Sequence, residues 1–202
     1  MMLWRGERPL VLASQSRSRG MLLSNAGLAF EAIPAHIDER GIQQASGLTG
    51  AGEVAGLLAR EKALAVSAQC LDRIVIGADQ TLACGPRLFE KPSGRAAAAD
   101  QLRALSGSVH ELHAAFAVTK NEEILTEQVA VARMKMRRLS DAQIETYLSY
   151  AGDAVTSSVG AYQLEGLGVH LFEAIEGDHF TILGLPLLPL LAFLREQGLV
   201  AL

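Results

Sequence analysis

The feature that most constrains this chain is a short apolar run that leads directly into a segment rich in serine and arginine. Residues 8–13 end in Leu-Val-Leu-Ala and have the composition of a buried β-strand. Residues 14–19, Ser-Gln-Ser-Arg-Ser-Arg, follow at once, and a helical pattern covers residues 18–26. A strand that feeds a helix in this way is typical of an α/β fold.

The serine- and arginine-rich segment has two interpretations. A phosphate site is favoured by the helix N-terminus, the hydroxyl groups and the arginines, because guanidinium groups form charge-assisted pairs with phosphate. Alternatively, one serine caps the helix and the arginines are solvated. The nucleotide motifs G-x-x-x-x-G-K-[ST] and G-x-G-x-x-G are absent from the sequence. The pattern alone therefore leaves both interpretations open.

The remaining patterns predict alternating strands and helices first and antiparallel strands later. We predict further strands over residues 73–79, 109–118, 123–136, 168–175 and 179–183, and further helices over 53–68, 94–105, 140–150 and from Pro186 to Gly198. Residues 30–39 are expected to be extended, and residues 41–52, rich in Gly, Ser and Gln, to be a loop. The length of 202 residues suits one domain over residues 1–202.

Composition and charge exclude several classes of protein. Hydrophobic residues make up 50% of the chain, which is enough for a globular core. The formal net charge of -4 offers no general field for nucleic acid or an anionic membrane, and we expect neither as a partner. The longest apolar run, residues 182–194, is shorter than the roughly 20 residues of a membrane span. Two cysteines, Cys70 and Cys84, without a signal peptide, fit a cytoplasmic protein.

Two acidic sites lie near the ends of predicted strands. Asp79 ends the strand 73–79, where open α/β sheets bind ligands, and it could hold a divalent cation or activate a water molecule. Asp38 and Glu39 form a carboxylate pair near the end of the extended segment. Capping of the next turn explains Asp79 equally well, and a polar loop explains the pair.

Two lysines complete the set of candidates. Glu61 and Lys62 are neighbours in a predicted helix and point about 100° apart, so one can face a site while the other is solvated. Lys91 precedes a proline, which holds it extended, and it could meet a phosphate or simply be exposed. Such lysines and carboxylates, together with the serines and arginines, are suited to binding a polyphosphate with a divalent metal.

Two other kinds of site are rejected. The positions of His110 and His113 differ by three, an odd number, which places them on opposite faces of a strand, so we reject them as ligands of one metal ion. The sequence contains no G-x-S-x-G motif of serine hydrolases.

Several blocks of the sequence resemble the Maf family in order and register. The opening block, LVLASQSRSRGMLLSNAGLAFEAIPAHIDE, is similar to the family pattern L-A-S-x-S-P-R-R, followed by L-L, a glycine and a D-E pair. The blocks AREKALAV, IVIGADQT, EKPSGRAAAADQLRALSGSVHELH, GAYQLEGLG and FTILGLPL follow in the family's order. The resemblance covers roughly residues 9–197, almost the whole chain.

The resemblance implies a single α/β domain with an elongated, curved, mixed sheet flanked by helices, similar to the inosine-triphosphate pyrophosphatases. Members of the Maf family are cytoplasmic and hydrolyse nucleoside triphosphates between the α- and β-phosphates, which yields a nucleoside monophosphate and pyrophosphate. They use a divalent metal, so we expect Mg²⁺, Mn²⁺ or Co²⁺ as cofactor. Homodimers are common in the family, and we expect a homodimer here.

The family's functional residues can be carried onto this chain where its motifs match. Asp79 matches the proposed general base, and Glu39 matches the acid of the D-E pair, so the two are expected to hold the metal. Lys62 and Lys91 match the lysines of the E-K-A and K-P blocks and would neutralise phosphate charge in the transition state. The other residues expected at the substrate are Ser14, Ser16, Ser18, Arg19, Gln80, Gln163 and Glu165.

Three of these positions bear on which base is bound. The dTTP and UTP branch of the family has Arg, Thr and Gln at the positions of Ser18, Gln80 and Glu165, and the 7-methyl-GTP branch has Trp, Gln and Glu. This chain matches the 7-methyl-GTP branch at the last two positions. A carboxylate can also accept hydrogen bonds from N1–H and the 2-amino group of guanine. We therefore expect 7-methyl-GTP or another guanine nucleotide as substrate.

Two alternatives remain. The first is a dTTP/UTP pyrophosphatase, which keeps the reaction and changes the base. The second is a nucleotide-binding regulator of cell division with little catalysis. Its support is the altered loop, in which Arg17 replaces the family's proline and Gly20 replaces a residue that is often arginine.

Overall fold

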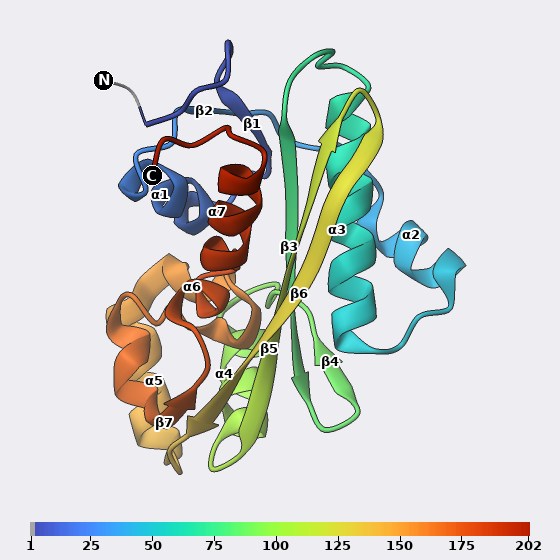
Figure 1. The fold of residues 1–202 in the computed structure, drawn as a ribbon. Helices are drawn as coiled ribbons and strands as arrows, with labels where there is room; N and C mark the ends of the chain where they lie inside the picture. Colours follow the sequence, from blue (N-terminus) through green and yellow to red (C-terminus); the bar gives the residue numbers. More distant parts are fainter. Residues whose placement is uncertain (1–2) are drawn as a thin grey trace. The chain divides into compact units, whose positions relative to one another are not determined.

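The computed structural model describes residues 3–202, which form a mixed α/β structure with a central sheet and flanking helices (Figure 1). This confirms the predicted fold class. The described residues divide into two compact units. The first comprises the residues up to Gln80 with Ala114–Ala130 and His179–Leu202, and the second comprises Thr81–His113 and Val131–Asp178. A single domain over residues 1–202 stays a prediction.

The described strands form one seven-stranded sheet in the order β2-β1-β3-β5-β6-β7, with β4 paired to β3. The strands are β1 (Leu10–Ala13), β2 (Phe30–Ala32), β3 (Val75–Cys84), β4 (Arg87–Phe89), β5 (Val109–Lys120), β6 (Glu123–Met136) and β7 (Phe172–Glu176). Strand β1 pairs in parallel with β2 and β3. Strands β4 and β7 pair antiparallel with β3 and β6. The sheet is therefore mixed, as the order of patterns in the sequence predicts.

The helices lie largely where the sequence predicts them. They are α1 (Arg17–Asn25), α2 (Glu39–Ser46), α3 (Ala51–Ser67), α4 (Arg95–Leu105), α5 (Asp141–Ala151), α6 (His179–Ile182) and α7 (Leu187–Glu196), with 3-10 helices at Gly152–Thr156, Val159–Ala161 and Leu167–Leu171. Ser140 caps α5 in the expected capping box, and α7 follows Pro186. Within residues 3–202, no helix combines the length and the apolar character that crossing a membrane requires.

Strand β1 carries the core of the first unit on both of its faces. Leu10 and Leu12 pack in one cluster with Leu23 of α1 and Leu190 of α7. Val11 packs in another with residues that include Val66 of α3. Because side chains alternate along a strand, α3 covers one face of the sheet, and α1 and α7 cover the other. Burial on both faces explains the uninterrupted apolar run of this strand.

The loop predicted over residues 41–52 is wrong, because the segment contains most of α2 and the start of α3. Asp38 caps α2 by accepting a hydrogen bond from the backbone N–H of Gly41 at 3.0 Å. Gly47 follows the helix with a φ of 68°, which glycine adopts without strain. None of the residues of α2 is buried. Its sequence therefore lacks the apolar stripe that usually reveals a helix.

The strands predicted over residues 168–175 and 179–183 are partly wrong. Strand β7 begins only at Phe172, because Leu167–Leu171 forms a 3-10 helix. His179–Ile182 forms the short helix α6. A short apolar run fits a strand or a buried helical turn equally well. Gly184 follows α6 with a φ of 92°, and this left-handed residue redirects the chain toward α7.

Strand β3 is longer than predicted, so Asp79 lies inside it and not at its end. Gly77 pairs with Ala13 in the parallel register with β1, whereas Leu82 pairs with Phe89 in the antiparallel register with β4. Asp79 therefore lies just beyond the parallel pairing, where the strand changes partner. A pattern of apolar residues shows where a strand is buried but does not show that it continues beside a new neighbour.

Strands β5 and β6 form the predicted hairpin. They are neighbours in the sheet, and Asn121 and Glu122 connect them with φ angles of 53° and 63°. Two consecutive positive φ angles are typical of the tight turn that suits the twist of a hairpin. Strand β7, the other neighbour of β6, pairs with it over Arg133 to Met136.

Candidate active site

Three charged side chains of the first unit meet beside strand β3. The Nζ atom of Lys62 lies 2.6 Å from Oδ1 of Asp79 and 2.9 Å from Oε1 of Glu39. Lys62 comes from α3, Asp79 from β3 and Glu39 from the first turn of α2. Lys62 and Asp79 are buried, whereas the Glu39 side chain is half exposed. The structure therefore brings together three of the residues that the sequence predicts for catalysis.

Close packing of α3 on β3 produces this meeting. Gly77 has no side chain, and a Cβ at this position would collide with the carbonyl oxygen of Ala59 and with Ala63 in α3. The glycine thus lets the helix backbone approach the strand, and Lys62, next to Ala63, reaches Asp79. Of the Glu61-Lys62 pair, Lys62 is therefore the buried residue that contacts the two carboxylates, and its role at a substrate site stays a prediction.

Arg19 is held by protein acceptors within the first unit. Its Nε donates to the carbonyl oxygen of Gly184 at 2.8 Å, and its Nη1 donates to the carbonyl oxygen of Ala78 at 2.8 Å and to Oγ of Ser14 at 3.0 Å. Burial lowers the pKa of the guanidinium, while the nearby carboxylates of Asp79 and Glu39 act in the opposite direction. Arg19 therefore fixes the serine- and arginine-rich segment to β3 and to the chain before α7.

The serines of the same segment organise the start of α1. Oγ of Ser16 accepts a hydrogen bond from the backbone N–H of Arg19 at 3.4 Å and caps the helix. Oγ of Ser14 accepts from the backbone N–H of Ser16 at 3.2 Å. Capping of the helix is therefore confirmed for Ser16, whereas solvation of the arginines is wrong for Arg19, which is buried. No acidic residue lies in the first turn of α1, so its N-terminus keeps the positive potential that phosphate binding needs, and the phosphate site stays a prediction.

Gln80 is oriented by the chain around α6. Its Nε2 donates to the carbonyl oxygens of Thr181 and Ile182 at 3.0 and 3.1 Å. Because a carbonyl can only accept, these two contacts define which end of the amide is nitrogen. The Oε1 atom is therefore the acceptor that Gln80 offers elsewhere. Ser18 is half-buried in the first turn of α1.

The remaining predicted residues belong to the second unit and are described within it. Lys91 is exposed in the connection between β4 and α4. Gln163 donates through Nε2 to Oγ of Ser157 at 2.8 Å. Its carbonyl oxygen accepts from the backbone N–H groups of Gly166 and Gly168. Glu165 is exposed in the turn so formed.

The two histidines of β5 have different surroundings in the second unit. His110 is fully buried, and its Nε2 lies 2.7 Å from the hydroxyl oxygen of Tyr162. Burial lowers the pKa of His110 to about 4. His113 instead contacts Oε2 of Glu111 at 3.1 Å. Such separate environments are those expected for residues on opposite faces of a strand.

The carboxylates of Asp79 and Glu39 suit a divalent cation only in part. Oxygen ligands are the ones that Mg²⁺ prefers. Over residues 3–202, no group of three or more His, Cys, Asp or Glu side chains is placed to hold a metal ion. Mg²⁺ usually takes one or two carboxylates together with water and substrate phosphates. The pair therefore fits a metal that arrives with a phosphate, and Lys62 lies between its two carboxylates.

The charges of the side chains in this cluster also favour a metal ion that arrives with a phosphate. Arg19 and Lys62 contribute two positive charges, and Asp79 and Glu39 contribute two negative charges, so the cluster is neutral as a whole. A polyphosphate brings several negative charges to such a cluster. A divalent cation would compensate part of that charge.

The sequence did not reveal the backbone acceptors that hold these side chains. They are the carbonyl groups of Ala78, Thr181, Ile182 and Gly184. Backbone groups carry no residue-specific signal. The sequence signal that hints at these acceptors is Gly184, the glycine of the FTILGLPL block. Its positive φ directs its carbonyl oxygen toward Arg19.

Comparison with known proteins identifies relatives over the whole chain. A family model described as Maf-like protein matches residues 9–197. The chain is 64% identical over 201 residues to a nucleoside triphosphate pyrophosphatase of Rhodopseudomonas palustris (strain BisB18), with 100% of both chains covered. It is 50% identical over 193 residues to a 7-methyl-GTP pyrophosphatase of Rhizobium meliloti (strain 1021), covering 95% of this chain and 97% of the relative.

Among solved structures, the chain is similar to a HAM1 protein from Coxiella burnetii. The TM-score is 0.44 at 20% sequence identity, and the match covers 64% of this chain and 73% of the other.

Proposed function

The chain belongs to the Maf-like protein family, and from that premise we propose that it hydrolyses nucleoside triphosphates to a nucleoside monophosphate and pyrophosphate. The proposal rests chiefly on one observation, the full-length match at 64% identity to a nucleoside triphosphate pyrophosphatase. The cluster of Glu39, Lys62 and Asp79 supports it, because it supplies the carboxylates and the cation that such a reaction requires.

Asp79 is the residue that we propose as general base. Asp79 is buried and lies where β3 stops pairing with β1 and begins to pair with β4. Lys62 binds one of its carboxylate oxygens at 2.6 Å. The ion pair fixes the direction of the carboxylate, so that Oδ2 is the atom available to orient a water molecule. Lys62 would then stabilise negative charge that develops on the phosphate oxygens.

A divalent cation is proposed as the cofactor. Asp79 and Glu39 would hold it, and it would supply charge compensation for the phosphate oxygens. Because the carboxylates are bridged by Lys62, binding of the ion requires the ammonium to share or leave this position. Ser14 and Ser16, at the start of α1, are proposed to meet the phosphates through hydroxyl and backbone donors, and Lys91 is proposed to add a further positive charge.

A guanine nucleotide, and 7-methyl-GTP in particular, is the proposed substrate. Gln80 and Glu165 match that branch of the family, and a relative at 50% identity is a 7-methyl-GTP pyrophosphatase. The fixed amide of Gln80 offers its oxygen as an acceptor. Gln163 and Glu165 would contribute the other polar contacts to the base. This chain has Ser18 where that branch has Trp, so it lacks the stacking surface of that Trp.

The experiment that tests the proposal measures pyrophosphate release from a panel of nucleotides with Mg²⁺, Mn²⁺ or Co²⁺. Fastest turnover of 7-methyl-GTP or GTP supports it, and loss of turnover with EDTA supports the metal. Fastest turnover of dTTP or UTP would favour the other branch. No release from any nucleotide would favour a nucleotide-binding regulator of cell division. Location in the cytoplasm and assembly as a homodimer are also proposed, on the family resemblance alone.

A further inference from the structure

Two residues with positive φ precede Gln163 and Glu165 in the second unit. Gly160 has a φ of 79° and Ala161 a φ of 62°. Glycine adopts this conformation freely, whereas alanine is strained in it, because the left-handed backbone brings Cβ too close to a carbonyl oxygen. Such strain persists only where the surrounding structure holds the residue, and it is concentrated at functional sites. Ala161 therefore needs neighbours that keep it in this conformation.

Tyr147 of α5 holds Ala161 directly. Its hydroxyl group donates to the carbonyl oxygen of Ala161 at 3.2 Å, and both residues are buried. Burial raises the pKa of Tyr147 to about 12, so the hydroxyl keeps its proton and remains a donor. The next residue, Tyr162, is anchored by its hydroxyl, which lies 2.7 Å from Nε2 of His110. Contacts from α5 and β5 thus fix the strained residue and its neighbour.

Gln101 of α4 connects the same segment to the chain that carries Lys91. Its Oε1 accepts a hydrogen bond from the backbone N–H of Gly160 at 3.1 Å. Its Nε2 donates to the carbonyl oxygen of Glu90 at 2.7 Å, and Glu90 directly precedes Lys91. Because one partner can only donate and the other can only accept, the orientation of the amide is defined. One side chain therefore links two segments that are expected at the substrate.

The chain after the strained residues forms a turn closed on the backbone of Gln163. The carbonyl oxygen of Gln163 accepts from the backbone N–H groups of Gly166 at 3.2 Å and Gly168 at 3.1 Å. A Cβ on Gly168 would lie 2.3 Å from this oxygen, so only glycine allows such a close approach. Glu165 lies within this turn, residues 163–168, which we call the Gln163 turn. The backbone at Ala161 therefore sets the direction in which the whole turn points.

We propose that Tyr147 and Gln101 are positioning residues for the Gln163 turn. They hold the two residues of positive φ in the conformation that directs the turn toward the nucleotide base. Gln101 also fixes the turn relative to Lys91. The inference rests on the proposed function, in which the turn contacts the base and Lys91 contacts the phosphates. Because both side chains act through the backbone, their loss should lower ligand affinity and raise KM without a matching loss of kcat.

The first experiment measures the dissociation constants of two ligands by calorimetry with Mg²⁺ present. Pyrophosphate has no base, whereas 7-methyl-GMP has one. If another nucleotide binds the natural chain more tightly, its monophosphate takes the place of 7-methyl-GMP. Neither ligand has to be cleaved, so binding is scored even if the chain releases no pyrophosphate from any nucleotide. Failure of this inference is thereby separated from failure of the proposed activity.

The two variants should differ in which ligand they lose. Tyr147→Phe removes one hydroxyl and keeps the ring, so Kd for 7-methyl-GMP should rise about tenfold, as for one lost hydrogen bond. Kd for pyrophosphate should stay that of the natural chain. Gln101→Met should weaken both ligands, because it releases the Gln163 turn and the chain before Lys91. For turnover of the triphosphate, Tyr147→Phe should raise KM and leave kcat nearly unchanged.

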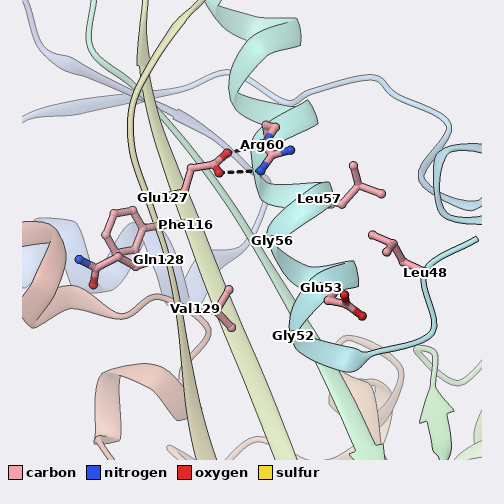
Figure 2. Close-up of a pocket in the computed structure, with 10 residues that line it drawn as sticks. All are labelled: Leu48, Gly52, Glu53, Gly56, Leu57, Arg60, Phe116, Glu127, Gln128 and Val129. Atoms are coloured by element: carbon pink, nitrogen blue, oxygen red, sulfur yellow. Dashed lines mark hydrogen bonds and ion pairs between the residues drawn. The ribbon is translucent and has the colours of Figure 1, made fainter. Parts of the chain in front are cut away.

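Two controls separate positioning from a general loss of structure. Tyr150→Phe removes a hydroxyl from the same helix α5, where Tyr150 is 79% exposed. Arg60→Met removes the ion pair with Glu127 in a pocket of the first unit, between α3 and β6 (Figure 2). Both controls should bind the two ligands as the natural chain does. If circular dichroism shows that Tyr147→Phe is unfolded, Gln101→Met carries the test.

Three results would overturn the proposal. The first is a Tyr147→Phe variant that binds 7-methyl-GMP like the natural chain or loses pyrophosphate to the same extent. The second is unchanged binding of pyrophosphate by Gln101→Met. The third is an equal loss of affinity in the Tyr150→Phe control.

The second experiment tests the strain at Ala161 by adding Ala161→Gly to Tyr147→Phe. Glycine takes a positive φ without strain, so the double variant should regain most of the lost affinity for 7-methyl-GMP although the hydroxyl is still missing. Damage to packing around residue 147 would not be repaired by a change at residue 161. A double variant that binds no better than Tyr147→Phe would therefore overturn the proposal.

Discussion

The first unit buries ionised side chains, whereas the second unit buries neutral ones. Lys62 and Asp79 form an ion pair at 2.6 Å, and Glu39 at the rim adds a second carboxylate. His110 and Tyr162 share one hydrogen bond at 2.7 Å, and burial lowers the pKa of His110 to about 4. Lys62 and Asp79 can be buried because their opposite charges pair. His110 can be buried because its ring is neutral.

The difference distinguishes groups kept for chemistry from groups kept for packing. Desolvating two charges is expensive, and apolar residues of similar size often stabilise a core as well as a buried ion pair does. The buried pair of Lys62 and Asp79 also contacts the half-exposed Glu39 through Lys62, so the pair is better explained by function than by stability. The buried His110 faces Tyr162 and Phe172, which pack around its ring, and its role is structural.

The largest expected effect comes from Asp79→Asn, which tests the chemical side of this comparison. The amide keeps the shape of the carboxylate but cannot act as a base, so kcat should fall about 10²–10⁴-fold. Nucleotide affinity, measured by calorimetry, should change far less. Asp100→Asn is the control, since Asp100 is an exposed acid that pairs with Arg103 on the surface. Turnover near that of the natural chain in Asp79→Asn would show that the base is another group.

Lys62→Met should have the second largest effect, on stability as well as on activity. It leaves the buried carboxylate of Asp79 without its cation, and breaking a buried ion pair in this way costs about 3–5 kcal/mol. Arg60→Met is the matched control on the same helix. Arg60 pairs with Glu127 where both side chains are half-exposed, so its loss should cost under about 1 kcal/mol. Urea unfolding measures the free energy of unfolding of both variants. Equal losses of free energy would contradict the distinction between the buried and the half-exposed ion pair.

The pH dependence of stability tests the neutral side of the comparison. The pKa of His110 is about 4 in the folded chain, below the unfolded value of about 6.5. The unfolded chain therefore binds the proton more readily, and the stability from neutral His110 is present above pH 6.5 and lost as the pH falls toward 4. The difference of about 2.5 pKa units, at about 1.4 kcal/mol for each unit, makes the loss roughly 3–3.5 kcal/mol at pH 4 and below.

His110→Phe supplies the reference for this measurement. It removes the titrating group and keeps an aromatic ring beside Tyr162 and Phe172. Urea unfolding between pH 7.5 and pH 4.5 should show a smaller decrease for the variant than for the natural chain, because other acidic groups contribute equally to both. Parallel curves would mean that His110 does not titrate in this range.

The same contrast explains which residues could be predicted from the sequence. Asp79 was a candidate because it ends a predicted buried strand, whereas Lys62 and Glu39 were assigned to the site by the resemblance to the Maf family, and the structure places the three in contact. The change of partner along β3 could not be predicted, because it depends on β1 ending and β4 beginning beside the strand. Helix α2 escaped prediction because capping by Asp38 and Gly47, and not apolar burial, defines its ends.

Arg19 shows the limit most clearly. Its position in the sequence favours a phosphate ligand, but its Nε and Nη1 donate to three protein acceptors. Those acceptors come from the first βα connection, from β3 and from the segment before α7, which are far apart in the sequence. A role in holding the site together is therefore visible only once the chain is folded.

Ser16 offers the smallest and most discriminating test, because capping and phosphate binding predict different results there. Ser16→Ala removes the cap of α1 and should cost about 1 kcal/mol of stability. Ser16→Asp keeps a good capping group, so stability should stay within a few tenths of a kcal/mol. If the helix start also binds phosphate, the added negative charge should repel the substrate and raise KM about tenfold or more. An unchanged KM in Ser16→Asp, measured beside restored urea stability, would mean that the serine only caps the helix and that the phosphates bind elsewhere.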